Sequence, residues 1–462
     1  MTHSKNITRT TPILLGRLTK FRTRALSSSM REPVNGSSLA MLRIVFGAIG
    51  VLSMVRILLN GWVRTLYAGP AHHFTYPSLG WVRPPSVGGM YVLVCVVGVA
   101  AACIAIGWRF RVAMAVFWIG FAWIEFIDIT TYLNHYWFVT LAGTLMLFAP
   151  MTNELASGAS RQPVSRGWIW LFRSQIAAVY CFAGLAKLHG DWLLHALPLR
   201  LWLPTRSDVP IIGSILDERW AAFAFSWAGA AFDCTIVGFL LWRRTRLVAW
   251  MVVIGFHVAT WRLFSIGVFP WLMIGATTLF FDPSWPRDLA HRVSRRPRRA
   301  VTQIPAGTAP RRFVVPLALA WVGLQVLIPL RHLAIDGDYR WTGEGYRYSW
   351  NVLLTERGGS VEFRVTDPVT RATSITDAAD LYTPLQWKQM STDPELIRQA
   401  AHLLGRLHTV DGERAEVRVD AFVSLNGRRA TRIIDPTVDL ADQPWRFGHQ
   451  PWILPAPTEP AP

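Results

Sequence analysis

Long apolar segments fill the first two-thirds of the chain, and short polar stretches separate them. Most are close to the roughly 20 residues that an α-helix needs to cross the hydrocarbon core of a bilayer. Nine segments can be distinguished, at about residues 37–59, 89–108, 112–129, 132–150, 167–188, 221–242, 246–264, 267–281 and 313–331. The eighth is short, which favours a tilted or re-entrant segment. The pattern predicts a multi-pass α-helical membrane protein of about nine helices.

The last third of the chain has a different pattern, typical of a small β-rich domain. Two stretches alternate between apolar and polar residues like half-buried strands. An Asn-Gly pair favours a hairpin turn, and an Asp-Pro pair favours the start of a helix. These features lie at residues 361–365, 415–423, 426–427 and 393–408, respectively. We therefore expect a C-terminal β-rich domain with one helix.

Composition and charge support a membrane protein and exclude a nucleic-acid partner. Only 16% of the 462 residues are charged, against about 25% in soluble domains. The net charge is +18, but residues 1–331 hold 33 Lys and Arg against 11 Asp and Glu, whereas residues 332–462 hold 14 against 18. The basic excess thus belongs to the membrane segments and their flanks.

The basic loops predict the orientation. Residues 1–36 carry seven Lys and Arg, and the loop at 282–312 carries eight Arg. With a cytoplasmic N-terminus, these and the other basic links all fall on the cytoplasmic side of nine spans. The domains are then a basic cytoplasmic segment, a membrane domain and an extracytoplasmic domain, at residues 1–36, 37–331 and 332–462. The Ser- and Thr-rich N-terminal segment also mildly resembles a transit peptide.

Cysteine and histidine spacing predicts no metal site. All four cysteines lie in apolar segments, at Cys95, Cys103, Cys181 and Cys234, and the chain has no Cys-x-x-Cys. A disulfide framework in the C-terminal domain is excluded because that domain has no cysteine.

Lys187 is the most informative polar residue of the membrane domain. The chain has only three other lysines, Lys5, Lys20 and Lys388, and none lies in an apolar segment. Arginine stays charged in any protein site, whereas a desolvated lysine can lose its proton and act as a base. A lysine near a helix end is also typical of an anchor that extends to the lipid headgroups. Both interpretations stay open, and the use of lysine favours proton chemistry.

Other polar residues fall near the same predicted depth. The third, fourth, fifth and seventh segments all have their outer ends on one side, within roughly two or three helical turns of each other. These ends carry Glu125, Asp128, Asn134, His135, Lys187, His257, Trp261 and Arg262. Each alone suits a packing or interface role, but several ionisable groups at one depth indicate a functional cavity. Asp233, in the middle of the sixth segment, is expected to lie deeper.

Short motifs around this cluster carry a family resemblance over most of residues 37–445. They are Arg173-Ser174-Gln175-Ile176, Phe182-Ala183-Gly184, Lys187-Leu188, Asp191-Trp192, Asn134-His135-Tyr136 with Asp128 upstream, Phe256-His257, Tyr348-Ser349-Trp350, Trp387-Lys388 and Ile434-Asp435-Pro436. In these motifs the chain resembles the vitamin K-dependent gamma-glutamyl carboxylase family, whose membrane part belongs to the horizontally transferred transmembrane (HTTM) superfamily. Ala186 departs from the vertebrate members, which have a second lysine there.

The resemblance implies an activity. A lysine amine deprotonates a reduced naphthoquinone, which reacts with O2. The strong base formed removes a γ-proton from a glutamate side chain, and the carbanion captures CO2. Lys187 corresponds to the initiating base, and His135 is the second candidate catalytic residue. The candidate quinol- or substrate-binding residues are Asn134, Asp128, His257, Trp261, Arg262, Tyr348 and Trp350.

Partners and location follow from the same resemblance. A lipid quinone of vitamin K or menaquinone type would come from the bilayer, a Glu-containing protein from outside, and a quinone reductase is a further expected partner. The preference for arginine over lysine suggests a GC-rich genome, hence a bacterial cytoplasmic membrane. Two alternatives remain: a quinol-dependent oxygenase or epoxidase that does not carboxylate glutamate, and a membrane transporter or binding protein without enzymatic activity.

Overall fold

The computed structural model describes residues 29–151, 163–264, 266–294 and 314–457. Most of the basic N-terminal segment and part of the basic loop before the last apolar segment lie outside these residues. In the described part, each predicted apolar segment forms a helix. The helices are α2 (Ser37–Leu59), α3 (Val87–Ile106), α4 (Phe110–Phe126), α5 (Asn134–Phe148), α6 (Arg166–Ala186), α10 (Arg219–Leu241), α11 (Arg246–Phe264), α12 (Phe269–Thr277) and α14 (Val314–Leu330).

Six helices of the described chain are long and apolar enough to cross a membrane. They are α2, α3, α6, α10, α11 and the segment Pro316–Ala334, which includes most of α14. Helices α4 and α5 have 17 and 15 residues, and α12 has nine. The prediction of a multi-pass helical membrane protein is confirmed, and the eighth segment is indeed too short for a full span.

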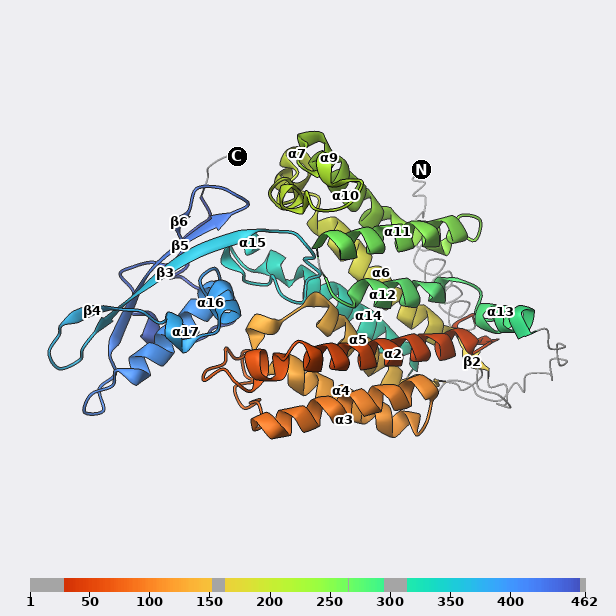
Figure 1. Cartoon of the computed structure of the whole chain (residues 1–462), viewed down its shortest axis with the longest axis horizontal. Helices are drawn as coiled ribbons and strands as arrows, with labels where there is room; N and C mark the ends of the chain where they lie inside the picture. Colours follow the sequence, from red (N-terminus) through yellow and green to blue (C-terminus); the bar gives the residue numbers. More distant parts are fainter. Residues whose placement is uncertain (1–28, 152–162, 265, 295–313, 458–462) are drawn as a thin grey trace, which may run out of the picture.

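Three short helices between α6 and α10 were not predicted. They are α7 (Gly190–His195), α8 (Leu199–Trp202) and α9 (Gly213–Leu216). Together they build a separate small core in which Trp192 and Leu203 are buried. Figure 1 shows α7 and α9 beside one end of α10, past the end of α6.

The C-terminal domain is built on a four-stranded antiparallel sheet with the strand order β4-β3-β5-β6. Its strands are β3 (Arg357–Thr366), β4 (Thr373–Thr376), β5 (Glu416–Leu425) and β6 (Thr431–Arg432). Alternate residues of β5 are buried, as the period of two in its sequence predicts. Pairing between β5 and β6 begins at Val423 and Thr431, so the connection is longer than the predicted hairpin turn.

The prediction of one helix in this domain is wrong, because its described residues form three α-helices. Helix α17 (Pro394–Leu407) begins after Asp393, whose carboxylate accepts from two backbone N–H groups of the first turn, as expected. Helices α15 (Tyr339–Thr342) and α16 (Pro384–Met390) precede it. Both are short, and four to seven residues give too few apolar repeats for a helical period to be recognised.

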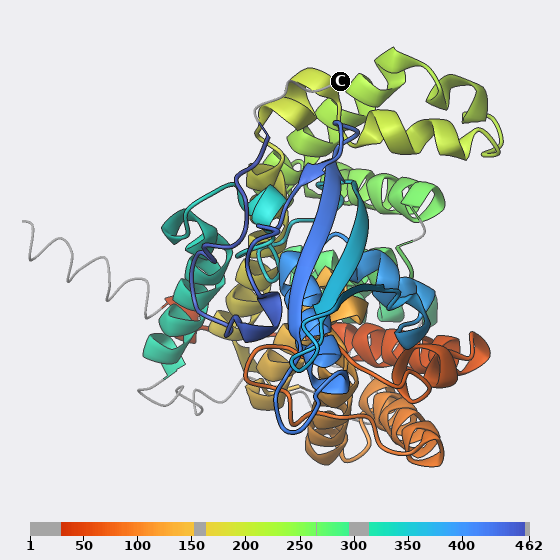
Figure 2. The ribbon, with the colours of Figure 1, turned by 90° about the vertical axis from the view of Figure 1, so that its left-hand side faces the viewer.

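The C-terminal domain packs on the membrane domain through the loop that follows α2. Phe74 of this loop stacks on Tyr382, with ring centroids 4.9 Å apart, and Thr75 N donates to Gln399 Oε1 of α17 at 2.9 Å. Phe74 and Ile129 belong to the same buried cluster as the sheet residues. Figure 1 shows the sheet at one end of the long helices, and Figure 2, viewed from that end, shows it lying across them. The two domains therefore share a packed interface.

Candidate functional site

Lys187 follows the last residue of α6, and its side chain runs back along the helix. Its Nζ donates to the backbone oxygen of Ala183 at 3.1 Å and to Oδ2 of Asp233, on α10, at 2.9 Å. Both residues are only 5% exposed. Helices α6 and α10 touch at Gly184, where a Cβ would lie 2.8 Å from the backbone nitrogen of Cys234. Glycine at this position thus allows the approach that brings the two charges together.

The pairing corrects the expectation that Asp233 lies deeper than the lysine. That expectation assumed that α10 begins at the level where α6 ends. Instead, α10 extends further out, where Ser226 forms two hydrogen bonds with Trp192 of α7. The Lys187 side chain also reaches back by one helical turn, about 5.4 Å. The extension of α10 and the backward direction of the lysine side chain together bring the Lys187 amine level with the Asp233 carboxylate.

The Lys187–Asp233 pair lines an apolar cavity of about 80 Å³. His257 of α11 lies in the same wall, and its Nε2 is 2.8 Å from the hydroxyl of Tyr180. The other ring nitrogen of His257 is buried and has no hydrogen-bond partner among the described residues. The indole of Trp192 covers the amine at 5.2 Å, a cation–π distance. Since buried polar atoms are normally satisfied, the imidazole is available to a polar group entering the cavity.

His135 does not reach this cavity. It lines a second apolar cavity of about 20 Å³, where its ring stacks on Phe269 with centroids 5.6 Å apart. Phe269, the first residue of α12, lines both cavities and also contacts the ring of His257. The single polar cluster predicted from the sequence is therefore divided, with the Phe269 ring between its two histidines.

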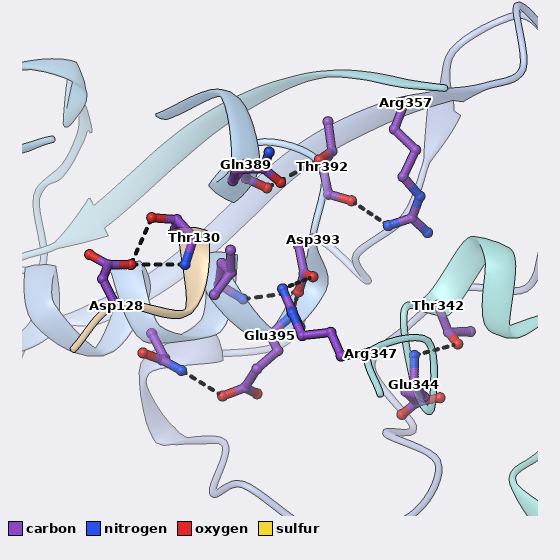
Figure 3. A network of polar contacts seen from close by, with 12 residues as sticks. Asp128, Thr130, Thr342, Glu344, Arg347, Arg357, Gln389, Thr392, Asp393 and Glu395 are labelled. Carbon is purple, nitrogen blue, oxygen red and sulfur yellow. Dashed lines mark hydrogen bonds and ion pairs between the residues drawn. The ribbon is translucent and has the colours of Figure 1, made fainter. Parts of the chain in front are cut away.

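Asn134 and Asp128 connect the two domains. Asn134 Nδ2 donates to the backbone oxygen of Asn351 at 3.0 Å. Asp128 is fully buried, accepts from Gln386 Nε2 of α16 at 2.7 Å, and lies 3.1 Å from His73. In Figure 3 the Asp128 carboxylate also accepts two hydrogen bonds from Thr130. Neither side chain lines the Lys187 cavity.

Trp261 and Arg262 are exposed on the outside of α11 and do not line the cavity. The cavity wall on this helix continues from His257 through Thr260 and Phe264, at helical spacings of three and four. Trp261 instead packs edge-on against Trp271, with centroids 5.7 Å apart. Neither candidate binding residue thus lies in the wall of the Lys187 cavity.

Residues 348–353 lie at the contact between the two domains. Tyr348 is partly buried, whereas Trp350 is fully buried and packs against Phe138. Val352 and Leu353 line the Lys187 cavity. Tyr348, Trp350 and Leu353 have φ values of 63°, 59° and 53°, a region that non-glycine residues occupy only when the surroundings enforce it. The segment is thus held in a costly conformation, and two of its residues line the same cavity as the amine.

A polar cavity of about 350 Å³ lies between the two domains. Asn134 lines it from the membrane domain, and Lys388 and Arg347 line it from the C-terminal domain. Figure 3 shows Arg347 reaching toward Asp393, with an N–O distance of 2.8 Å, and Arg357 donating to the backbone of Thr392. The two cavities share no lining residue. Val352 and Leu353 line the apolar cavity, whereas Thr355 and Glu356, a few residues further along the chain, line the polar cavity.

The segment after Lys187 is fastened to the sheet by Asp191. Its carboxylate accepts from Arg428 at 2.6 and 2.8 Å and from Asn426 at 2.8 Å. Burial raises the pKa of Asp191, but the hydrogen bonds from Arg428 and Asn426 outweigh it and lower the pKa to about 2. The predicted Asn-Gly turn thus has a second role, since the Asn426 side chain reaches the membrane domain.

This contact gives a prediction for stability. A carboxylate with a lowered folded-state pKa contributes stability that is complete above the ordinary aspartate pKa of 3.8 and is lost as the pH falls through about 2. We expect Asp191→Asn to lower the free energy of unfolding by about 2 kcal/mol at neutral pH, because it removes charged hydrogen bonds. Unfolding of both proteins from pH 7 to pH 2 is the measurement. A difference that persists at pH 2 would contradict the ion pair as its cause.

Two family matches cover nearly all of the described chain. The HTTM domain family matches residues 31–285, more than half of the sequence, and the vitamin K-dependent gamma-carboxylase lumenal domain family matches residues 310–459. No solved structure matches the chain. The first match covers the helices that hold the Lys187–Asp233 pair, and the second covers the sheet and the C-terminal part of the polar cavity wall. The protein is thus an integral membrane protein with a lumenal domain, and it belongs to the vitamin K-dependent gamma-glutamyl carboxylase family.

Proposed function

We propose that this protein is a gamma-glutamyl carboxylase-like enzyme. It couples oxidation of a hydroquinone of vitamin K or menaquinone type by O2 to the addition of CO2 at the γ-carbon of a protein glutamate. The observation that carries the proposal is the placement of the Lys187 amine, buried in an apolar cavity whose wall at Val352 and Leu353 is followed along the chain, at Thr355, by the wall of a polar cavity between the two domains. A quinol ring in the apolar cavity and a glutamate side chain in the polar cavity would therefore lie on either side of residues 352–356.

The apolar cavity suits the ring of a reduced naphthoquinone, which on oxidation would supply the strong base that removes the γ-proton. Aromatic and aliphatic side chains form most of its wall. Lys187 would accept a hydroxyl proton at Nζ, and the free ring nitrogen of His257 would hydrogen-bond a ring oxygen. A two-ring head group is larger than about 80 Å³, so its binding displaces side chains of the wall. We expect Leu353, whose backbone conformation is enforced by its surroundings, to be the side chain that moves.

The polar cavity suits the glutamate side chain of a protein substrate. Its wall carries three cationic side chains, Arg347, Arg357 and Lys388, against the acidic Glu356 and Asp393, so a basic charge remains for a substrate carboxylate even with Arg347 paired to Asp393. Asn134 can position the substrate from the membrane domain. Tyr348 and Trp350 line neither cavity and would act by fixing the segment that carries Val352 and Leu353, with Trp350 away from the surface. His135 would join the quinol site only when the Phe269 ring moves, and Asp128 would act by fastening the domains.

The proposed location is a bacterial cytoplasmic membrane, with a cytoplasmic N-terminus and the C-terminal domain outside. The quinone would enter sideways from the bilayer and the protein substrate from the extracytoplasmic side. The ends of α2, α4 and α6 that meet the C-terminal domain fit this orientation. A membrane quinone reductase must regenerate the hydroquinone, because each turnover oxidises it.

Oxygen consumption tests the enzymatic part of the proposal. We expect the purified full-length protein in lipid nanodiscs to consume O2 when a naphthohydroquinone is added, and to form a quinone epoxide in proportion. A protein that binds the quinol without consuming O2 would favour the transporter or binding-protein alternative. Consumption without labelling of any glutamate peptide by CO2 would favour the oxygenase alternative.

A further inference from the structure

We propose that Asp233 is the positioning residue of the base: its carboxylate fixes the Lys187 amine at the cavity and stabilises the ammonium group that forms when the amine accepts a proton. This inference rests on the proposed function of Lys187. It concerns a residue that lies on a different helix from the lysine and that no sequence motif pointed to.

The geometry gives Asp233 control of the amine. Two of the three hydrogen-bond directions of Nζ are used, by the Ala183 oxygen at 3.1 Å and by Asp233 at 2.9 Å. The Trp192 ring closes a further side at 5.2 Å. Lys187 and Asp233 both line the apolar cavity, so the remaining direction is open to a ligand there. A flexible lysine side chain is thereby held in one orientation, which is the requirement for proton transfer at hydrogen-bond distance.

The proton balance also requires a nearby anion. When a hydroquinone hydroxyl loses its proton to Lys187, the O–H bond breaks, an N–H bond forms at Nζ and the electron pair stays on the oxygen. A positive charge then appears in an apolar cavity, where an unpaired charge is costly. The Asp233 carboxylate lies 2.9 Å away and offsets this cost. It therefore makes the amine a stronger base than burial alone would allow.

The surrounding groups leave this role to Asp233. The titratable side chains around the pair are Tyr180 and Cys181 on α6, His189 in the link to α7, Cys234 on α10 and His257 on α11. Burial and the charge of Arg340 lower the pKa of His189 to about 4, so it is neutral at physiological pH. The next charges, Asp191 and Arg340, are paired with Arg428 and Asp338. Among the described residues, Asp233 is the carboxylate in contact with Nζ.

Asp233→Asn in the full-length protein is the decisive variant, because the amide keeps the shape and an acceptor oxygen but removes the charge. We expect the rising limb of quinol-dependent oxygen consumption against pH to move to lower pH by at least one unit, since the ammonium form is no longer stabilised. The plateau of kcat should fall at least tenfold, because the amine becomes a weaker base, while KM for the quinol changes little. Asp233→Glu, which keeps the charge, should keep the limb near its wild-type position.

A direct titration provides the second readout. With only four lysines in the chain, selective isotopic labelling of lysine gives a simple NMR spectrum, in which Lys187→Arg identifies the signal of Lys187. We expect its midpoint to move to lower pH in Asp233→Asn. Glu125→Gln is the matched control, because Glu125 is another buried carboxylate that bonds Thr140 instead. It should leave the midpoint unchanged.

The outcomes separate this inference from the proposed function. The wild-type protein could be active while Asp233→Asn changes neither the pH dependence of oxygen consumption nor the titration midpoint of Lys187. That result would overturn the role of Asp233 and leave Lys187 as the base. A loss of kcat without movement of either would likewise overturn it, because a merely structural residue gives that result. A wild-type protein that consumes no oxygen with a naphthohydroquinone would overturn the proposed function itself.

Discussion

Lys187→Ala is expected to reduce quinol-dependent oxygen consumption by about 10²–10⁴-fold, the usual contribution of a positioned general base. The amine is the basic group that lines the apolar cavity, and alanine leaves Asp233 without its partner. A buried carboxylate without a counter-charge is destabilising, so folding must be measured with activity. Thermal unfolding and the oxygen electrode together give both values.

Lys187→Arg distinguishes a base from a fixed charge. Arginine keeps the positive charge and can pair with Asp233, so the folding defect of this variant should be smaller than that of Lys187→Ala. Its guanidinium cannot give up its proton in a protein, so we expect the same loss of activity. An arginine variant that consumes oxygen at close to the wild-type rate would show that the residue serves only as a charge.

Gly184→Ala, although it lies outside the cavity, should reduce both stability and activity. The added Cβ would lie 2.8 Å from the backbone nitrogen and from the sulfur of Cys234, closer than atoms in contact can lie. Helices α6 and α10 must then separate, which costs about 1–3 kcal/mol of unfolding free energy as overpacking. The separation also lengthens the Lys187–Asp233 contact, so activity should fall at least tenfold even in the folded fraction.

Gly238→Ala is the matched control for this prediction. Gly238 lies on the same helix, α10, and a Cβ built there meets no atom within 4 Å. We expect unchanged activity and a stability equal to or slightly above that of the wild type, because alanine has the higher helix propensity. Equal losses in the two variants would contradict a specific contact at Gly184.

The sequence predicted the helices and strands well, because their signals are local. Apolar runs alone located the membrane helices, and the period of two in β5 gave its buried face. The cap of α17 was predicted from Asp393 and the proline after it, since capping depends on adjacent residues. Short α15 and α16 were missed, because so few residues carry no recognisable period.

The site depends on contacts between distant residues, so the sequence predicted it only in part. It identified Lys187 and His257, which do line one cavity. It separated Asp233 from them, because the outward extension of α10 past α6 is set by packing around α7. It placed His135 with them, because nothing in the sequence shows that the Phe269 ring lies between the histidines.

The interface between the domains was the least predictable part. Trp350 is an aromatic residue at the start of a soluble domain, and such a position favours an exposed recognition surface. The structure buries it against Phe138 of α5. The partner of Asp191, Arg428, lies more than two hundred residues away in sequence. Such pairings cannot be recognised in a single sequence, because neither residue carries a local signal for the other.

The most direct test of the proposed carboxylation is the incorporation of labelled CO2 into a glutamate-containing peptide. The peptide is incubated with the full-length protein in nanodiscs, a naphthohydroquinone and O2, and the product is analysed for acid-labile γ-carboxyglutamate. We expect label with the wild-type protein, none when the quinol or O2 is omitted, and none with Lys187→Ala. A wild-type protein that consumes oxygen with the quinol yet never labels a glutamate would contradict the proposed function.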